Sequence, residues 1–419
     1  MDMAVKFFRK KWLLRLALML VSAWATLCFW QAPVIYSQMT APQENRAVWM
    51  TNYGASLMYY STRLDEVVAN LAKHHLNTLY PAVWNRGYTL HQSTVAKQAG
   101  GVPRDRLTSL PFLPFQDSLR ELTHQAHRQH LRLIPWFEYG LMMPVNSAIA
   151  RQHPDWLTTN LAGETVTGGV LTPPTNPLLR PLWHLQTEAA GANQGWLNPF
   201  HPEVQQFLID LIVEVVERYP VDGIQLDDHF GLPIEFGYDA YTQELYRQDH
   251  GGQAPPPNPA DPKWIAWRAD RITLLMERIA ASVRAVNSDA IVSLSPNPPA
   301  FAYDKYLQDW TRWISLGLLD EVVVQVYRDD LTALEATLYD GGFRGLKEQV
   351  PISIGLYTGP PGQAKSVETM QQEVAAVQAA GYRGVAFFCW ETTLWALKGS
   401  PSEAVYNFLI TQLPRTESS

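Results

Sequence analysis

The feature that most constrains this chain is a regular alternation of short apolar runs with amphipathic stretches. Eight runs rich in Val, Ile and aromatic residues are typical of buried strands. They cover residues 46–52, 76–84, 131–139, 223–228, 291–297, 321–327, 351–357 and 384–391. Between them, apolar residues recur at helical spacing in the stretches 64–71, 204–216, 272–283 and 367–380.

Eight alternating β and α units predict an α/β fold, a (β/α)8 TIM barrel in which helices surround parallel strands. An open, doubly wound sheet is the alternative fold. That fold normally carries a glycine-rich turn after its first strand, and residues 52–56 (NYGAS) do not form one.

Two connections are longer than the others. Residues 140–199 follow the third predicted strand, show no periodic pattern and are rich in Gly, Pro, Thr and Asn. Residues 231–262 follow the fourth strand and contain the turn-rich run GGQAPPPNPADP. Because long loops in compact domains usually carry function, and because residues 140–199 follow a strand, we expect this first insertion over the mouth of the barrel. We predict one barrel domain over residues 42–419 with these two βα-loop insertions.

The first 41 residues differ in composition from the rest. Five basic residues lie within the first fifteen positions, and the uncharged apolar run Leu16–Trp30 follows. This pattern predicts a secretory signal peptide or an uncleaved N-terminal anchor. Fifteen apolar residues are short for a transmembrane helix, which favours the signal peptide, with Ser37 or Ala41 as candidate cleavage positions. We therefore expect an exported protein (periplasmic, cell-envelope or extracellular), with a membrane tether where the segment is retained.

Charge and cysteine content narrow the function classes. The full chain carries a net charge of −7, and the five bases and one acid of residues 1–41 leave −11 for the remainder. An acidic body is a poor binder of nucleic acid, so we expect no nucleic-acid partner. Cys28 lies in the apolar run, which leaves Cys389 alone in the body and excludes an internal disulfide or a cysteine metal site there.

Polar and aromatic side chains gather where the predicted strands end, which is where barrel enzymes place their chemistry. Acids and amides bind hydroxyl groups, and indole faces stack on sugar rings, so this set predicts a sugar site. Its members are Trp49, Asn52, Trp84, Asn85, Arg86, Trp136, Glu138, Asp227, Asp228, His229, Asn297, Gln325, Tyr327, Arg328, Tyr357, Trp390 and Glu391.

The run VDGIQLDDHF supplies the leading catalytic candidate. Cleavage of a glycosidic bond needs two carboxyl groups, a protonated acid and an ionised nucleophile or base. Alternation along the strand places Asp227 on the face opposite Leu226 and Asp228, so one acid can face the barrel mouth while its neighbour turns toward adjacent loops or helices. Asp227 is the leading candidate for the nucleophile or base. Glu391 is the first candidate for the general acid, with Glu138 and Asp228 as alternatives. Each acid also has a structural interpretation, as an acceptor for loop N–H groups or as a salt-bridge partner.

The remaining predicted site residues are substrate contacts. They are the aromatic, amide and imidazole side chains Trp49, Asn52, Trp84, Trp136, His229, Asn297, Tyr327, Tyr357 and Trp390. Several indoles at one barrel mouth suggest several sugar subsites, and hence a polymeric substrate.

Over residues 44–395 the chain resembles the bacterial glycosyl-hydrolase-like barrels of the glycoside hydrolase family 10-like group. The motifs that carry the resemblance are RAVWMTN, WLNPFHPEV, VDGIQLDDHF and FFCWE, in that order. The layout is similar to that of α-amylase-like barrels, whose nucleophilic Asp ends strand four, where this chain has Asp227. The chain departs from that pattern at strand five, which ends in SLSPNPP without an acid, and from true family-10 xylanases at strand seven, which ends in GLYTGPP.

The resemblance implies an exported glycoside hydrolase that cleaves O-glycosidic bonds of a polysaccharide, with peptidoglycan strands stripped of their peptides among the implied substrates. It implies no metal or other cofactor. A non-catalytic glycan-binding barrel is the main alternative. A metal-dependent barrel hydrolase such as a deacetylase is a further one, but it needs two histidines at ligand spacing, and of eleven histidines only His229 lies at a strand end.

Overall fold

The computed structural model describes residues 12–23, 32–34, 44–51, 64–105, 117–166, 175–176, 193–360, 363–390 and 392–393. Its main sheet is parallel and follows the order β5-β2-β1-β13-β12-β11-β10-β9-β6. The strands are β1 (Asn45–Met50), β2 (Thr78–Pro81), β5 (Arg132–Leu133), β6 (Trp136–Phe137), β9 (Gly223–Asp227), β10 (Ile291–Ser295), β11 (Glu321–Gln325), β12 (Ile352–Tyr357) and β13 (Gly384–Phe388). Each of the eight predicted apolar runs therefore contributes a strand.

The sheet begins and ends with pieces of one chain segment, because only residues 134 and 135 separate β5 from β6. Pro135 lacks an N–H group, which interrupts the regular ladder. The segment still bonds on both sides: the Ile134 N–H donates to the Leu79 carbonyl at 3.0 Å, and the Gln225 N–H donates to the Pro135 carbonyl at 2.8 Å. The strands therefore curl into a TIM-like barrel.

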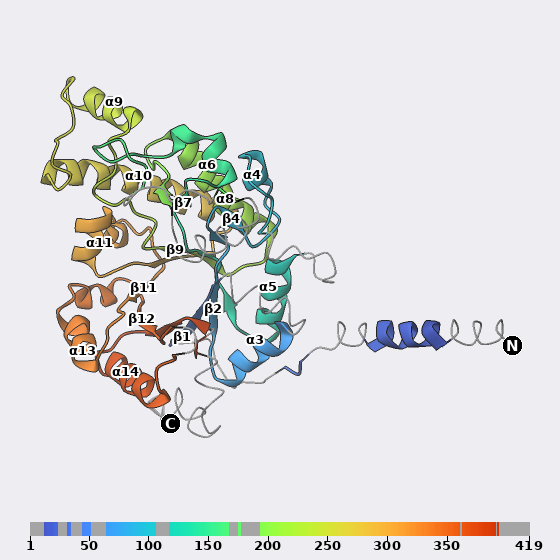
Figure 1. Cartoon of the computed structure of the whole chain (residues 1–419). Coiled ribbons are helices and arrows are strands. Elements are labelled where there is room, and N and C mark those ends of the chain that lie inside the picture. Colours follow the sequence, from blue (N-terminus) through green and yellow to red (C-terminus); the bar gives the residue numbers. More distant parts are fainter. Residues whose placement is uncertain are drawn as a thin grey trace, which may run out of the picture.

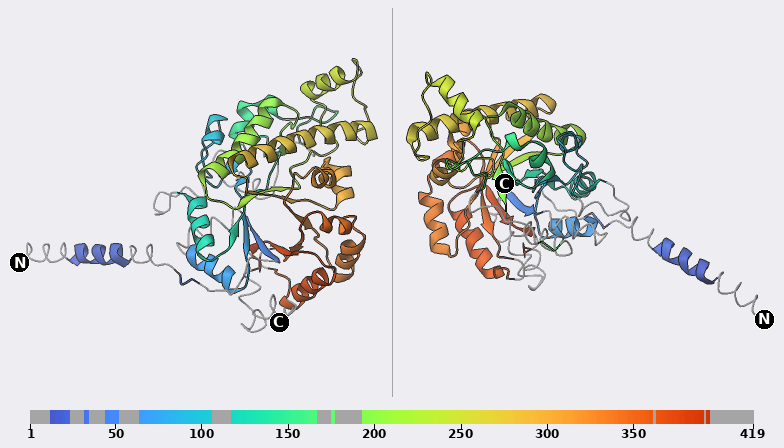
Figure 2. Two further views of the ribbon diagram at one scale, coloured as in Figure 1. Left: turned by 180° about the vertical axis from the view of Figure 1, so that it is seen from behind. Right: turned by 45° about the horizontal axis from the view of Figure 1, so that its top comes forward.

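Helices cover the outside of the strands (Figures 1 and 2). They are α3 (Leu64–Lys73), α5 (Ser118–Arg128), α8 (Pro202–Arg218), α10 (Pro262–Val286), α11 (Pro299–Tyr306), α12 (Trp310–Ser315), α13 (Leu331–Asp340), the 3-10 helix η3 (Arg344–Glu348) and α14 (Val367–Ala379). The start of α8 is fixed as the sequence suggests, with Pro202 at its first position and the His201 side chain accepting from the Glu203 N–H.

Alternation along each strand separates two apolar layers. In β1, Ala47 and Trp49 point into the barrel, while Val48 and Met50 pack toward the helices. The inner layer is small and aromatic; its members are Ala47, Trp49, Tyr80, Ala82, Ile134, Trp136, Val323 and Ala386. This layer fills the barrel below the ends of the strands.

The two long connections contain short elements of their own. The described parts of 140–199 hold β7 (Met142–Pro144), α6 (Ala148–Gln152), the 3-10 helix η2 (Pro154–Trp156) and β8 (Gln194–Trp196), and β7 pairs with β8 in antiparallel fashion. Residues 231–262 hold α9 (Ala240–Asp249), which projects beyond the barrel (Figure 1). The description of both stretches as insertions into a single domain stays a prediction.

The N-terminal part of the chain touches the body through a short described segment. The Ala32 N–H donates to Asp65 Oδ2 at 2.6 Å, and the Ala32 and Pro33 carbonyls accept from Arg128 and Gln129 at 3.2 and 3.0 Å. Residues 12–23 are helical with exposed apolar side chains. Among the described residues, no helix has both the length and the apolar character needed to cross a membrane.

The contact between β1 and β13 yields a stability prediction. Gly384 has φ +150°, and a Cβ there would lie 1.9 Å from the Asn45 carbonyl oxygen. We expect Gly384→Ala to lower the free energy of unfolding by about 3 kcal/mol, because it adds both a backbone clash and strain. Gly345→Ala in η3 is the control, since its Cβ would meet no atom within 4 Å. It should change stability by less than about 1 kcal/mol in denaturant unfolding. Equal effects of the two substitutions would show that the close approach of β1 and β13 at Gly384 does not require a glycine.

Candidate active site

The candidate site lies where β6, β9, β10 and β11 end. Asp227 is the last residue of β9, is only 2 % exposed and points inward, because it follows Gln225 on the inner face. Gln325 at the end of β11 donates from Nε2 to Asp227 Oδ1 at 2.9 Å. Asp227 thus lies at the carboxyl end of β9, where the sequence analysis places it, and its catalytic role stays a prediction.

His229 joins both aspartates of the LDDH run. Its Nδ1 lies 3.1 Å from Asp227 Oδ2, 3.4 Å from Asp228 Oδ1 and 3.1 Å from the Glu138 carbonyl oxygen. A nitrogen that faces three oxygens acts as a hydrogen-bond donor, so it carries the proton. The strand ends at Asp227, and the chain then turns, with the Phe230 N–H bonded to the Asp227 carbonyl at 2.9 Å. This turn lets both acids reach one imidazole.

Charge and burial oppose each other in this cluster. Burial raises the pKa of the Asp227 carboxyl well above its usual range, and the charge of Asp228 adds to the rise, while the hydrogen bond from His229 opposes it. Burial alone would lower the pKa of His229, but the negative charges of Asp228, Asp227 and Glu138 outweigh it and raise that pKa to about 10. The imidazole is therefore a cation at neutral pH.

Glu138 follows β6 on the strand beside β9, and the pairing of Phe137 with Leu226 places it level with Asp227. Its carboxylate accepts a short hydrogen bond from Asn85 Nδ2. Asn85 is presented by the hairpin of β3 (Trp84–Asn85) and β4 (Tyr88–Thr89), whose turn residues Arg86 and Gly87 have φ +54° and +77°.

The two candidate salt-bridge partners for Glu138 are Arg86 and Arg132. Arg86 instead bonds Asn85 at 2.6 Å and Asp105 at 3.5 Å, and Arg132 bonds Glu321 at 3.1 Å near the amino ends of the strands. The amide of Asn85 therefore separates the Glu138 carboxylate from the Arg86 guanidinium in this chain of contacts.

The mouth is bordered by an amide and by aromatic rings. Asn297, after β10, donates from Nδ2 to Asp228 Oδ2 at 2.7 Å. Tyr327 packs against Tyr357 and Phe388, with ring centroids 5.8 Å away in each case. Burial and the charges of Asp227 and Asp228 raise the pKa of the Tyr327 phenol well above its ordinary value, so this hydroxyl stays neutral and can donate a hydrogen bond.

Two predicted aromatic contacts carry unused donors. The indole N–H groups of Trp136 and Trp390 are buried and have no hydrogen-bond partner among the described residues. Trp136 lies one level below Glu138 inside the barrel, with its ring 6.2 Å from Phe388. The Trp136 N–H, directly below Glu138, is therefore a candidate partner for a ligand hydroxyl.

Two other predicted contacts are core residues. Trp49 is 1 % exposed and donates from Nε1 to Gln225 Oε1 at 2.7 Å in the inner layer. Trp84 is completely buried, packs on Phe207 of α8 and donates to the Gly140 carbonyl at 3.2 Å. Neither indole has a free face for a sugar, so both expectations are wrong in this structure. Asn52 and Glu391 lie outside the described residues, and their roles stay predictions.

Some residues of the site were missed from the sequence. Gln308, just after α11, is buried and donates from Nε2 to the Asp227 and Phe230 carbonyls at 3.0 Å each, which fixes the turn that carries His229. Tyr139 and Trp196 flank His229 with ring centroids 6.2 and 6.1 Å away. No local pattern marks Gln308, whereas Trp196 lies in the long connection 140–199 that the sequence analysis expects over the barrel mouth.

A metal ion is the remaining possibility for this cluster. One donor atom from each of Asp227, Asp228 and His229 lies within 4.8 Å of the others. A metal at this place would have to displace the proton from His229 Nδ1, which already bonds the carboxylates. The donor set also lacks the second histidine that a metal-dependent barrel hydrolase requires. The geometry therefore fits a hydrogen-bonded acid cluster better than a metal centre.

Comparison with known proteins decides the family. The model of the glycosyl hydrolase-like 10 family matches residues 44–376. The chain belongs to this family. The resemblance inferred from the sequence motifs is thereby confirmed, as is the prediction of a glycoside-hydrolase type of protein.

Individual relatives are more distant. Glycosyl hydrolase DigH of Escherichia coli K12 is 25% identical over 245 residues, 51% of this chain and 47% of that protein. Glycosyl hydrolase YngK of Bacillus subtilis 168 is 24% identical over 238 residues, 51% of this chain and 39% of that protein. The match thus spans less than half the length of these curated relatives.

Solved structures share the fold. The glycoside hydrolase domain of PgaB (BpsB) from Bordetella bronchiseptica superposes with a TM-score of 0.57 at 13% identity, covering 87% of this chain and 98% of that domain. Alpha-L-fucosidase isoenzyme 2 from Paenibacillus thiaminolyticus gives 0.56 at 14% identity, covering 87% and 48%. At these identities the likeness concerns the barrel alone.

The charge balance of the cluster can be tested directly. We expect the His229 ring to titrate at about 10 by nitrogen NMR, and Asp228→Asn to lower that pKa, because the Asp228 charge is the largest influence that raises it. Asp289→Asn, at an exposed loop position, is the control and should leave it unchanged. A wild-type value near 6.5 would show that His229 does not bridge the two carboxylates.

Proposed function

We propose that this protein is an exported glycoside hydrolase that cleaves O-glycosidic bonds of a polysaccharide, with a peptidoglycan-type cell-wall glycan as its substrate. The observation that carries the proposal is the pair of aspartates that share the His229 imidazole, Asp227 and Asp228, with Glu138 level with Asp227 on the neighbouring strand. Family membership supports the reaction class. Tyr327 and Tyr357 are partly exposed at the strand ends and provide ring surfaces that suit a sugar. The buried indole N–H of Trp136, below Glu138, is an unused donor for a sugar hydroxyl.

The two required carboxyl roles are proposed as follows. Asp227 acts as nucleophile or base. Burial and the Asp228 charge raise the pKa of its carboxyl, while the His229 imidazolium at Oδ2 and the Gln325 amide at Oδ1 stabilise the ionised form and offset part of that rise. Glu138 is the proton donor that the described residues favour, because it lies level with Asp227 on the neighbouring strand. Asp228 is the alternative donor, and Glu391 remains a further candidate. His229 is a positioning residue for the carboxylates.

Export is proposed on the basic and apolar N-terminal sequence. The contacts of Ala32 and Pro33 with Asp65, Arg128 and Gln129 favour retention of these two residues in the mature protein. Cleavage at Ser37 or Ala41 would remove them. We therefore revise the site of processing to a position before Ala32, or to no cleavage at all, with the apolar helix kept as a tether.

The catalytic roles predict separable defects. Asp227→Asn should lower kcat/KM at least a hundredfold on peptide-free peptidoglycan glycan and on activated aryl glycosides, because both need the ionised carboxylate. Glu138→Gln should be as damaging on the natural glycan but much less on aryl glycosides, whose leaving groups need no proton. The assay is reducing-end release, with folding checked by circular dichroism.

Matched variants decide among the acids. If Asp228→Asn or Glu391→Gln shows the dependence on the leaving group and Glu138→Gln does not, the proton donor is reassigned to that residue. If the wild-type protein releases nothing from any glycan but binds one, and Asp227→Asn binds equally well, the catalytic reading fails and the glycan-binding barrel replaces it.

The processing proposal has its own measurement. Mass spectrometry of the protein isolated from its native envelope should find a mature N-terminus at or before Ala32, or the intact chain. The same chain produced without export gives the unprocessed reference mass. A mature protein that begins after Pro33 would show that the contacts with Asp65, Arg128 and Gln129 are not needed.

A further inference from the structure

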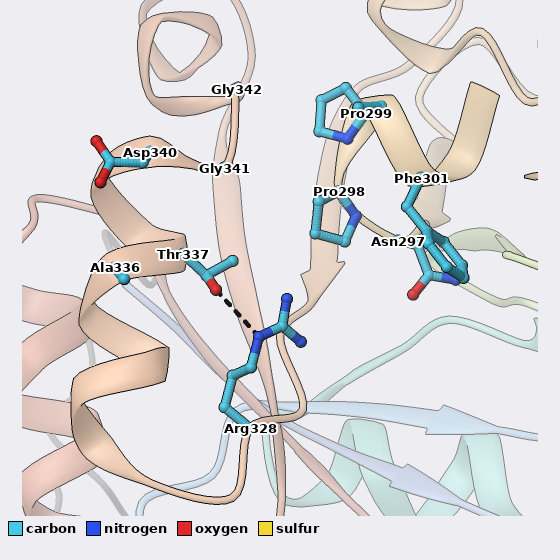
Figure 3. Close-up of a pocket in the computed structure, with 11 residues that line it drawn as sticks. Asn297, Pro298, Pro299, Phe301, Arg328, Ala336, Thr337, Asp340, Gly341 and Gly342 are labelled. Carbon is cyan, nitrogen blue, oxygen red and sulfur yellow. Dashed lines mark hydrogen bonds between the residues drawn. The ribbon is translucent and has the colours of Figure 1, made fainter. Parts of the chain in front are cut away.

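An open groove of about 780 Å³ lies between the loop after β10 and the end of α13 (Figure 3). One wall comes from the loop after β10 and the start of α11, and the other from the end of α13. The lining residues are Asn297, Pro298, Pro299, Ala300, Phe301, Arg328, Ala336, Thr337, Asp340, Gly341 and Gly342. No step of the reaction described above uses this groove.

The groove contains a fixed guanidinium group. Arg328 donates from Nε to Thr337 Oγ1 at 3.0 Å and from one terminal nitrogen to the Tyr327 carbonyl at 3.0 Å. Thr337 is itself held, because its hydroxyl donates to the Ala333 carbonyl at 2.9 Å. Figure 3 shows the terminal nitrogens of Arg328 directed into the space between the two walls.

This cation has no carboxylate partner within the part of the chain that the structure describes, although many other arginines there form ion pairs. Asp340 also lines the groove, but it is exposed at the rim and its carboxylate points away from Arg328 in Figure 3. A half-buried guanidinium that is held by two neutral acceptors retains donors for an anion.

The opposite wall is apolar. Pro298 and Pro299 face the groove, and the Phe301 ring is 49 % exposed. A flat, exposed aromatic ring opposite a fixed cation suits a ligand that has an apolar face and one charged substituent. A sugar ring that carries a carboxylate has both features.

The groove adjoins the acid cluster through one shared residue. Asn297 lines the groove and also donates to Asp228 Oδ2 at 2.7 Å, and its own carbonyl accepts from Trp310 Nε1 at 3.0 Å. On the other side, Arg328 directly follows Tyr327, whose pKa responds to Asp227 and Asp228. The groove therefore lies next to the acids, at the position of a neighbouring sugar unit in a bound chain.

We propose that the groove is a subsite for a sugar unit bearing a carboxylate, and that Arg328 is the residue that selects it. This inference rests on the proposed glycosidase function and specifies its substrate as an acidic glycan. The single cation, with an acidic residue at the rim, fits one negative charge better than a doubly charged phosphate.

The test compares one glycan in two charge states. Full-length wild-type protein is assayed on peptide-free peptidoglycan glycan and on the same glycan with its carboxyl groups reduced to alcohols. We expect kcat/KM to favour the acidic glycan by between about tenfold and a hundredfold, the range of a charge-assisted hydrogen bond. Arg328→Gln should remove this preference by losing activity on the acidic glycan alone, and Arg328→Lys should keep part of it.

Arg344→Gln is the matched control, because Arg344 lies on η3, is exposed and packs over Tyr339 outside the groove. It should leave the preference unchanged. Binding of both glycans to the Asp227→Asn variant, with and without Arg328→Gln, is measured by calorimetry as a readout independent of turnover. The acidic glycan should bind more tightly only where Arg328 is present.

The outcomes separate this inference from the function on which it rests. Hydrolysis of both glycans at equal rates, or a preference that survives Arg328→Gln, overturns the subsite and leaves the glycosidase intact. Binding that depends on Arg328 without any hydrolysis overturns the glycosidase and keeps the subsite. Neither hydrolysis nor binding of either glycan overturns both.

Discussion

The segment 132–137, which contains β5 and β6, is the constraint on which the rest of the structure depends. It bonds β2 on one side and β9 on the other, and so joins the two ends of the sheet order into a TIM-like barrel. Glu138, Asp227 and His229 come from segments about ninety residues apart, and this closure brings them together. Without it, Glu138 would lie at one edge of a sheet and would have no carboxylate neighbours.

Placing negative charge in a buried site costs free energy, and the side chains around the acids offset this cost by donating hydrogen bonds. Two amides, Gln325 and Asn297, each donate to one aspartate, and the imidazolium of His229 serves both. Gln308 holds the backbone of the turn. The carboxylates of Asp227 and Asp228 are therefore each oriented by a neutral donor. The shared His229 cation stabilises the ionised form of both.

The sequence predicts the fold well, because the period of the apolar pattern reports directly on strands and helices. It also identifies Asp227, Asp228, His229, Asn297 and Glu138, because polar residues that interrupt apolar runs at strand ends are conspicuous. It fails for Trp49 and Trp84, because an indole in an apolar run looks the same whether it fills the core or faces a ligand. Gln308 depends on contacts across 81 residues, which no local pattern reveals.

The docking of Ala32 against α3 and α5 limits where such a barrel can work. Residues 24–31 separate the apolar helix from the docked segment, and a fully extended chain of this length spans only about 30 Å. While the N-terminal segment remains attached, the barrel stays within roughly one domain diameter of any bilayer that holds the helix. Its substrate would then be restricted to glycan in the layer nearest the membrane. The length of the connection 24–31, as well as the chemistry of the groove, would decide which glycan chains are cut.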